Sequence, residues 1–382
     1  MIPWCRVVFP PARGRPGSDL AKSVEKKPVP LDPLDFERSE LEREVTALGA
    51  KAFHGRQVFR WLWRNGTSDF ETMTNLGRDL RARLAAHFSL EAPRVESRQT
   101  SVDGTAKFLL RLADGRHVES VYIPDTPAQT FCVSTQVGCA MACAFCLTGK
   151  MGLVRHLTAG EIAAQVRTLA LETGLIGSPF NVVLMGMGEP LHNYDATMKA
   201  VRILADDQGL GVHPQRVTLS TVGLVPAIER LATEPIMPNL AISLHATTEE
   251  QRARIVPITR KYSLADLIDA CRRFPVAKRR RITFEYVLLD GVNDTPADAR
   301  RLVALLNPIR AKVNLLPLNE APAIAFKRPP DERVNAFARI LAERGLRVSV
   351  RRSRGRDIRA ACGQLLVESE ARSSGQALAD RM

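Results

Sequence analysis

Hydrophobic positions recur every three or four residues between about residues 36 and 90, which is the spacing of one face of an α-helix. Three such stripes are separated by Gly49, Asn65-Gly66 and Asn75-Leu76-Gly77, which are typical of turns. We therefore expect a small helical domain at residues 36–92. A basic helical domain can hold RNA, although a solvated polar face is the simpler interpretation of its charges. Its basic side chains are His54, Arg56, Arg60 and Arg64.

The next region has the pattern of a β-hairpin. Residues 107–112 and 117–124 read as two strands, and Ala113-Asp114-Gly115-Arg116 between them is a turn signal. Residues 93–124 are therefore expected to form a hairpin that connects the helical domain to the remainder of the chain.

From residue 130 onward, short apolar strands alternate with amphipathic helices. Strands separated by helices pair in parallel through right-handed crossovers. Six such units predict an α/β fold, a partial (βα)6 barrel at residues 125–367 with its chemistry at the carboxyl ends of the strands. A doubly wound open sheet is the alternative. The expected strands are 130–135, 180–186, 216–221, 239–244, 282–289 and 312–318, and the expected helices are 158–173, 192–205, 223–233, 263–274, 296–307 and 330–344.

The two ends of the chain lack a sustained pattern. Residues 1–35 are rich in proline, glycine and charge, and we expect a flexible leader there and a flexible tail at residues 368–382. No apolar run approaches the ~20 residues that span a bilayer, and the first residues are too short and proline-broken for a signal peptide. These features predict a cytoplasmic protein.

Charge adds a hint about the partner. Among the 382 residues, Lys and Arg total 54 against 41 Asp and Glu, a net charge of +13, and 43 of the 54 are arginine. Arginine suits phosphate recognition, and a basic surface of this size attracts nucleic acid. An arginine-rich genome explains the same excess equally well.

The cysteines carry more specific information. Four of the seven fall within fifteen residues, and in a chain without an export signal such clustering favours metal binding or redox chemistry over disulfides. Cys139, Cys143 and Cys146 form the spacing C-x3-C-x2-C directly after the first predicted barrel strand. Three thiolates can hold three corners of a cubane iron–sulfur cluster and leave the fourth iron open. The alternative is a zinc site completed by Cys132 or His156.

Three longer motifs surround these residues, and with them the chain resembles a known enzyme family. They are Cys132-Val133-Ser134-Thr135-Gln136-Val137-Gly138-Cys139, Met185-Gly186-Met187-Gly188-Glu189-Pro190-Leu191 and Arg359-Ala360-Ala361-Cys362-Gly363-Gln364-Leu365. The cysteine loop at the head of a (βα)6 series resembles the radical S-adenosylmethionine (SAM) superfamily. From about residue 41 to 367 the chain is similar to its RlmN/Cfr family, which methylates adenosine in RNA.

The resemblance implies a [4Fe–4S] cluster on Cys139, Cys143 and Cys146, with SAM on the open iron. It also implies that Gly188-Glu189 meets the amino group of SAM, where a carboxylate beside an ammonium is the expected chemistry. The other implied cofactor-binding residues follow successive strands, so that their polar groups can converge. They are Ser220, Ser243, Leu244, His245 and Asn319.

The resemblance further implies a two-thiol mechanism that consumes two SAM molecules. Cys362 matches the cysteine that takes a methyl group from one SAM, and a radical made from the second SAM then activates this S-methyl group for addition to the base. Cys132 matches the cysteine that resolves the covalent protein–RNA adduct, which leaves a Cys132–Cys362 disulfide to be reduced. Glu119 matches the carboxylate that accepts the proton.

The residues themselves support part of this assignment. The arginine-rich segment 349–359 precedes Cys362, where it would favour a thiolate and draw in RNA phosphate. For Cys132, burial in the core is the serious alternative. Glu119 alone reads as an exposed hairpin residue, and Cys5 and Cys271 receive no role.

The resemblance implies methylation of C2 of an adenosine in 23S rRNA, and of a tRNA adenosine next to the anticodon, by a monomer that receives electrons from a donor such as a flavodoxin system. Methylation of C8, as in the Cfr branch, is the nearest alternative. A radical SAM enzyme without methyl transfer and a non-catalytic RNA-binding module are two others. The chain departs from the family pattern at His156, where asparagine is usual, and at Glu320, where proline is common.

Overall fold

The computed structural model describes residues 31–124 and 128–367, and the described residues from Leu31 onward form one compact unit. The expected leader and tail fall mainly at residues 1–30 and 368–382, which lie outside the described residues. Ordered structure begins before residue 36, because the 3-10 helix Pro33–Asp35 places Leu34 in the core with no exposed surface. The domain boundaries suggested by the sequence stay predictions.

Three helices form the N-terminal region, as the apolar stripes predict: α1 (Arg38–Ala47), α2 (Ala52–Trp63) and α3 (Arg78–His87). Each buries the residues of its stripe, such as Leu41 on α1. The first two helices cross closely at Gly55, where a Cβ atom would lie 2.6 Å from the Cα of Glu42. A larger residue at position 55 would push these helices apart.

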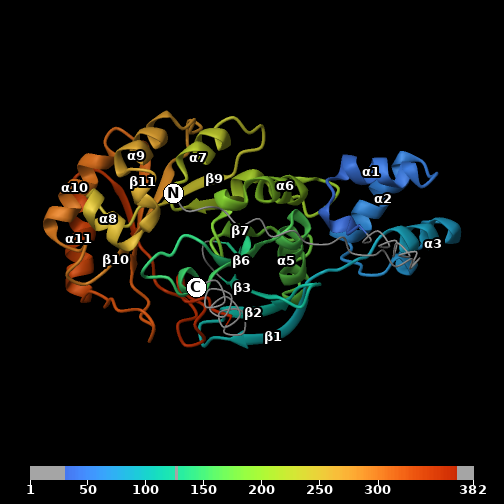
Figure 1. The fold of residues 1–382 in the computed structure, drawn as a ribbon, viewed down its shortest axis with the longest axis horizontal. Coiled ribbons are helices and arrows are strands. Elements are labelled where there is room, and N and C mark those ends of the chain that lie inside the picture. The colour runs from blue at the N-terminus through green and yellow to red at the C-terminus, as the bar shows by residue number, and fades with distance from the viewer. Residues whose placement is uncertain (1–30, 125–127, 368–382) are drawn as a thin grey trace, which may run out of the picture. The chain divides into compact units, whose positions relative to one another are not determined.

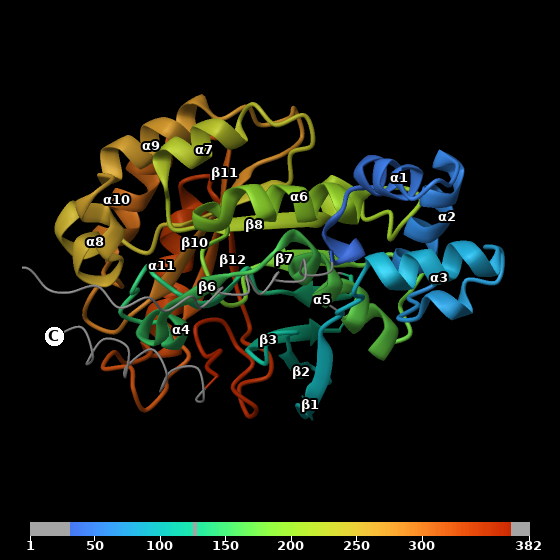
Figure 2. The same cartoon turned by 45° about the vertical axis from the view of Figure 1, so that its right-hand side comes forward.

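This helical region is fastened to α5 (Ala159–Glu172) and α6 (Tyr194–Ala205), beside which it lies in Figures 1 and 2. Arg167 of α5 is buried and donates to the carbonyl oxygens of Gly66 and Thr67 at 2.8 and 2.6 Å. Arg38 and Asp206 form an ion pair at 2.8 Å. The region therefore shares a core with the barrel and cannot be removed without exposing apolar surface.

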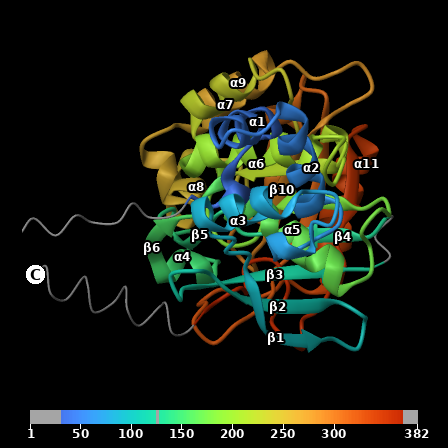
Figure 3. The same cartoon turned by 90° about the vertical axis from the view of Figure 1, so that its right-hand side faces the viewer.

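One sheet of ten strands organises the described residues. Its first three strands are antiparallel, and Arg111 pairs with His117 across the predicted hairpin turn. Figure 3 shows them side by side. Strand β3 also pairs antiparallel with β4, and from β4 onward seven strands are parallel, each paired with the next strand of this sheet. The strands, in spatial order, are β1 (Arg94–Thr100), β2 (Ala106–Arg111), β3 (His117–Ile123), β4 (Thr130–Cys132), β7 (Asn181–Leu184), β8 (Val217–Thr221), β9 (Asn239–Ser243), β10 (Ile282–Leu288), β11 (Ala311–Pro317) and β12 (Arg347–Val350).

This order decides between the two architectures that the sequence allowed. A doubly wound sheet reverses its strand order near the middle, whereas here the order runs in one direction from β4 to β12. Strands β1 and β12 are the two edges, so the barrel is partial. The predicted α/β partial barrel is confirmed.

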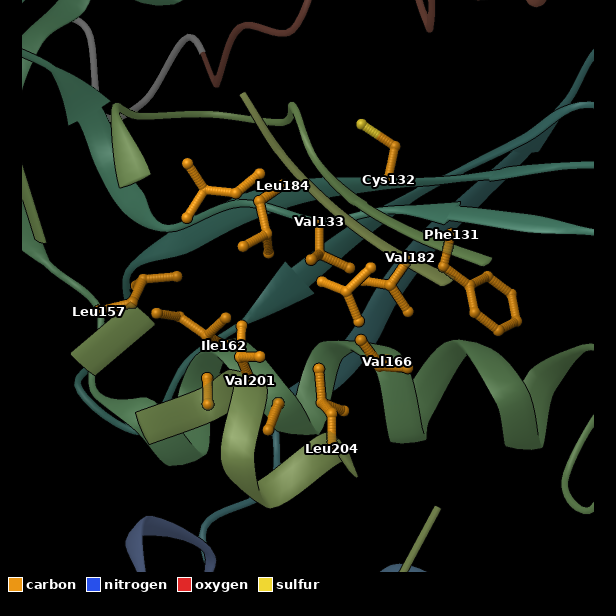
Figure 4. Packing of buried hydrophobic residues seen from close by; sticks show 14 of the residues in the cluster. Phe131, Cys132, Val133, Leu157, Ile162, Val166, Val182, Leu184, Val201 and Leu204 are labelled. Atoms are coloured by element: carbon orange, nitrogen blue, oxygen red, sulfur yellow. The ribbon is translucent and has the colours of Figure 1, made fainter. Parts of the chain in front are cut away.

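Helices pack on the outer face of the parallel strands (Figure 1). Figure 4 shows the core that results, in which Val182 and Leu184 of β7 meet Ile162 and Val166 of α5. The helices after α6 are α7 (Val225–Leu231), α8 (Glu249–Ile255), α9 (Leu264–Arg273), α10 (Pro296–Leu306) and α11 (Asp331–Glu343). Further 3-10 helices are Phe70–Thr72, Pro190–Asn193, Pro214–Arg216 and Pro257–Arg260. None of the described helices is long and apolar enough to cross a membrane.

The structure contains elements that the sequence pattern did not predict. Strand β12 is a seventh parallel strand where six were expected, and β1 and α8 are also additional. Strand β12 has only four residues, and its exposed edge carries arginine and serine, so it lacks the apolar run of a buried strand. The first barrel strand, expected at 130–135, has only three residues.

Candidate active site

The three clustered cysteines lie on a loop framed by a small antiparallel sheet. Cys139 ends β5 (Gln136–Cys139), which pairs with β6 (Gly152–His156), and the short helix α4 (Leu147–Met151) begins directly after Cys146. A Cβ atom on Gly138 would lie 1.9 Å from the carbonyl oxygen of Gly152, and its φ is +75°. Only glycine allows the strands to approach this closely, so Gly138 fixes the path into the loop.

Cys139, Cys143 and Cys146 line one cavity of about 950 Å³ at the carboxyl ends of the barrel strands. Burial raises the pKa of all three thiols. Coordination to iron reverses this, because a bound metal keeps its thiol ligands deprotonated. Within the described ranges no three His, Cys, Asp or Glu side chains surround the position of one ion, so the fit to a cluster rests on the donor set and its shared cavity.

The predicted Gly188-Glu189 element reaches this cavity after β7. Gly188 has a φ of +102°, and a Cβ atom there would lie 2.7 Å from the Cβ of Gln136. The Glu189 carboxylate accepts hydrogen bonds from the N–H groups of Leu191 and Val222 at 3.0 and 2.9 Å. Burial nevertheless raises its pKa to about 7. Glu189 is therefore a carboxylate that a ligand's ammonium would help to ionise.

The zinc alternative from the sequence finds no support at His156. The side chain of Gln136 connects this histidine to Glu189: its Nε2 lies 3.0 Å from Nδ1 of His156, and its Oε1 accepts from the N–H of Glu189 at 2.8 Å. His192 lies at 3.2 Å from the same Nε2 atom. His156 therefore contacts Gln136, which in turn holds the backbone of Glu189. The position at which the family usually has asparagine is occupied here by this histidine.

Four of the other predicted cofactor-binding residues line the same cavity: Ser220, Ser243, His245 and Asn319. The hydroxyls of Ser220 and Ser243 are 3.4 Å apart. The side chain of Leu244 instead lies fully buried in the hydrophobic core. The structure therefore brings the predicted set together except for this one side chain.

His245 and Asn319 show how these positions are held. Nδ1 of His245 accepts the N–H of Val287 at 3.0 Å, and burial lowers the pKa of the ring to about 3, so the imidazole is neutral. Asn319 donates to the carbonyl oxygen of Cys362 at 3.2 Å. Its Oδ1 is buried without a hydrogen-bond partner among the described residues. That acceptor is available to a ligand in the cavity.

Cys132 and Cys362 meet at a second cavity of about 520 Å³, and Cys362 lines both cavities. Figure 4 shows the Cys132 side chain pointing away from the helices, on the opposite side of its strand from Phe131 and Val133. Cys132 is 6% exposed, and burial raises its pKa to about 12. Arg351 and Arg354 of the arginine-rich segment line the cavity with the two thiols.

Glu119 lies outside both of these cavities. It is 5% exposed, which corrects the exposed position that its place in a hairpin predicts. Its carboxylate pairs with Lys107 at 2.8 Å and accepts the N–H of Leu366 at 2.8 Å. Burial raises its pKa against the opposing charge of Lys107. It lines a third cavity with Gln364 and Leu366, whereas Leu365 lines the cavity of the two thiols.

The sequence pattern did not single out Glu285 or Arg351, both of which line the cluster cavity. A signal for Glu285 was present in the strand 282–289, where Thr283 and Glu285 interrupt apolar residues at alternate positions. Such alternation indicates a polar inner face. Arg351 could not be distinguished from its arginine neighbours by pattern alone.

Comparisons with known proteins agree with this geometry. Residues 133–303 match the family model of the radical SAM superfamily, and residues 31–90 match that of the ribosomal RNA large subunit methyltransferase N-terminal domain. The first match contains the cysteine loop and most barrel strands. The second covers the helical region.

Relatives match nearly the whole chain. A dual-specificity RNA methyltransferase RlmN from Syntrophobacter fumaroxidans is 46% identical over 339 residues, which is 89% of this chain and 99% of the relative. One from Geobacter sulfurreducens is 49% identical over 326 residues, 85% of this chain and 89% of the relative. The crystal structure of a radical SAM methyltransferase from Sphaerobacter thermophilus has 47% identity and a TM-score of 0.84, and covers 88% of this chain and 99% of that one. This chain therefore belongs to the RlmN family of radical SAM RNA methyltransferases.

Proposed function

We propose that this enzyme methylates C2 of an adenosine in 23S rRNA and in tRNA, and that Cys362 and Cys132 act in sequence as methyl carrier and resolving thiol. The observation that carries the proposal is that Cys362 lines both the cluster cavity and the cavity of Cys132. A carrier must face the methyl donor and also the thiol that later releases it. The names of the relatives support the RlmN branch, and with it C2 rather than C8.

In the first half of the reaction, the thiolate of Cys362 displaces the methyl group from the sulfonium of SAM, which forms a thioether and S-adenosylhomocysteine. Gly188 and Glu189 hold the amino end of SAM, with the Glu189 carboxylate oriented by the N–H groups of Leu191 and Val222. Ser220, Ser243 and Asn319 bind the nucleoside part. Asn319 also fixes the backbone of Cys362 through its carbonyl oxygen.

In the second half, Cys139, Cys143 and Cys146 would hold the [4Fe–4S] cluster, which would supply the electron for cleavage of a second SAM and so for activation of the methyl group of Cys362. The donor of that electron is a flavodoxin-type protein. The base then becomes joined to Cys362 through the former methyl carbon. Cys132 attacks the Cys362 sulfur, which releases methylated RNA and leaves a disulfide that an external dithiol reduces.

We assign Glu119 as the proton acceptor on the basis of the family motif. In this structure its carboxylate is occupied by Lys107 and by the N–H of Leu366, four residues after Cys362. The role therefore requires these two contacts to open when RNA enters. The buried position favours a proton-accepting role, because burial has already raised the pKa of Glu119.

RNA binding is assigned to the N-terminal helices together with the segment Arg351–Arg359. On α2, Arg56 and Arg60 and the adjoining Arg64 are exposed at intervals of four residues, so they share one face. Arg60 and Arg64 form no ion pair among the described residues, which leaves them free for phosphate.

The enzyme acts as a monomer in the cytoplasm, where its RNA substrates are found.

The decisive experiment uses the reconstituted enzyme with an RNA fragment, SAM and a reductant. Mass spectrometry of the RNA should find 2-methyladenosine, and 8-methyladenosine would assign the enzyme to the alternative branch. Peptide analysis should find an S-methyl group on Cys362. A protein that cleaves SAM without forming this thioether would contradict the carrier mechanism.

Two variants separate the roles of the thiols. Cys362→Ala should lack the thioether and form no protein–RNA adduct. Cys132→Ala should be methylated at Cys362, attack the RNA once and remain as a covalent adduct on a denaturing gel. Cys271→Ala is the matched control, because Cys271 is equally buried but lines neither cavity. Normal turnover by Cys132→Ala would show that Cys132 is only a core residue.

A further inference from the structure

The inside of the partial barrel contains a buried carboxylate for which the proposed function has no use. Glu285 on β10 is 5% exposed and lines the cluster cavity. Its Oε1 accepts from Nδ2 of Asn314 at 3.0 Å, whereas its Oε2 is buried without a hydrogen-bond partner among the described residues. A buried carboxylate destabilises the folded state unless a cation opposes its charge.

Among the cations that oppose the effect of burial on Glu285, Arg351 has the largest influence on its pKa, followed by Lys312. Arg351 directly follows β12, and its N–H donates to the carbonyl oxygen of Leu315 at 2.8 Å, which places it at the end of the barrel that holds the cavities. Arg351 and Glu285 line the same cavity. Cys362 and then Glu285 raise the pKa of Arg351, and Arg351 in turn opposes the effect of burial on Glu285.

The guanidinium of Arg351 has unused donors. In the described part of the chain it makes no hydrogen bond to another residue. An arginine carries five N–H donors, so this one can still bind an anion. An anion that forms on either thiol would lie on the same cavity wall as Arg351, because Arg351, Cys132 and Cys362 line one cavity.

Cys132 is the group that needs such a cation. The thiolate is the nucleophile, and burial opposes its formation. Burial and the neighbouring Cys362 both raise the pKa of Cys132, and Arg351 is the cation that lowers it. The other charged group on this cavity wall is Arg354, while Lys107 and Glu119 face each other on the neighbouring cavity.

We propose that Arg351, which lines the cluster cavity together with Glu285, stabilises the thiolate of Cys132 as it attacks the sulfur of Cys362. Arg351 is then a catalytic residue of product release, and Glu285 is its positioning residue. The inference deepens the proposed two-thiol function and rests on it.

The step balances in atoms and electrons. The Cys132 thiolate forms a bond to the Cys362 sulfur, and the bond from that sulfur to the carbon on the base breaks. The electron pair of the broken bond passes to the carbon, which takes up one proton and becomes the methyl group. The two thiols are oxidised to a disulfide while the carbon is reduced.

The first test measures the charge effect without RNA. The cluster-loaded enzyme is treated with iodoacetamide at pH 7.5, and alkylation of Cys132 is followed over time by peptide mass spectrometry. Arg351→Met, which keeps the length of the side chain and removes its charge, should slow alkylation at least tenfold. Arg351→Lys should restore the rate to within about threefold. Glu285→Gln should lower it, because the variant retains Arg351 but removes the charge that positions it.

Arg352→Met is the matched control, because Arg352 is exposed and lines neither thiol cavity. Iron content and melting temperature show that each variant is folded, and Arg351→Lys and Glu285→Gln serve if Arg351→Met does not fold. Equal alkylation rates for the wild type and Arg351→Met, or no recovery in Arg351→Lys, would overturn the proposal.

The second test uses RNA and separates this proposal from the two-thiol function. Arg351→Met should methylate Cys362 and accumulate the covalent adduct, as Cys132→Ala does, and Arg351→Lys should release product. If Cys132→Ala forms no adduct, the two-thiol function fails, whereas the alkylation rates still report the effect of charge. Rapid release by Arg351→Met would reject Arg351 as the catalytic cation.

Discussion

Cys132 and Cys271 are two buried cysteines with similar surroundings and different expected roles. Their exposed fractions are 6% and 1%, burial raises the pKa of each to about 12, and an arginine charge acts on each. For Cys271 on α9 the arginine is Arg252, whose Nε, Nη1 and Nη2 atoms all donate to protein oxygens. For Cys132 it is Arg351, which has donors to spare and borders a cavity with a second thiol.

The difference teaches that burial and a nearby charge do not by themselves make a thiol reactive. Arg252 donates hydrogen bonds to the carbonyl oxygens of Leu244 and Val222 and to the hydroxyl of Thr259. It therefore connects α8 to the segments that follow β8 and β9. Arg351 makes no side-chain hydrogen bond in the described part of the chain, and it lines the cavity of the two thiols. A cavity and unsatisfied donors distinguish the two sites.

The largest effect on cluster content and SAM cleavage should come from replacing the thiols of the cluster loop, and replacing Cys271 should have no such effect. Replacing Cys139, Cys143 or Cys146 with alanine should abolish the brown chromophore and the cleavage of SAM, because each supplies one corner of the cluster. Cys271→Ala should retain both. Iron analysis and product chromatography measure the outcome, and full iron content in all three loop variants would contradict the assignment.

The two arginines should differ in their effect on stability. Arg252→Met leaves several fully buried oxygens without donors, and each unsatisfied group costs about 1–3 kcal/mol, so we expect a loss of about 3 kcal/mol in the free energy of unfolding. Arg351→Met should cost about 1 kcal/mol, because Glu285 can take up a proton instead of staying charged. Denaturant unfolding compares the two, and equal losses would remove the distinction between them.

A third contrast concerns basic residues that we propose to bind RNA and exposed basic residues elsewhere on the protein. Reversing Arg60 and Arg64 to glutamate should reduce RNA affinity about 10- to 100-fold and lower the salt slope by about 2, because each phosphate contact releases counterions. Arg339 and Arg344 are also exposed but lie at α11, and they provide the control with the same change in charge. Point substitutions are the better test than deletion of the helical region, because that region shares a core with the barrel. Equal losses in the two double variants would indicate a general effect of charge.

The smallest effect should be a pH dependence of SAM binding in the cluster cavity, which Glu189 lines and Cys271 does not. The pKa of Glu189 is raised to about 7, so the carboxylate is neutral below that pH and ionised above it. Its attraction for the ammonium of SAM is therefore present above pH 7 and is lost as pH falls through 7. The dissociation constant should rise several-fold between pH 8 and pH 6, and Glu189→Gln should remove this dependence. Calorimetry at several pH values measures it, and a flat wild-type profile would contradict the role of Glu189.

The sequence predicted much of the fold because the patterns that specify it are local. The helical stripes, the hairpin and all six helices expected between strands can be recognised within windows of ten to twenty residues. Strand β12 could not be recognised in this way, because its pairing with β11 supplies what its short exposed sequence lacks. The small sheet of β5 and β6 depends likewise on a close approach at Gly138.

For the active site, the sequence by itself determined the chemical groups: three thiols at cluster spacing, the Gly188-Glu189 element, and the two further cysteines. Only the tertiary structure decided which groups meet. It placed Cys132 and Cys362 on the wall of one cavity, Glu119 against Lys107 on a different cavity, and Glu285 and Arg351 on the wall of the cluster cavity. The physical reason is that spacing along the chain fixes neighbours within one loop, whereas contacts between distant strands depend on how the sheet curves and where it remains open.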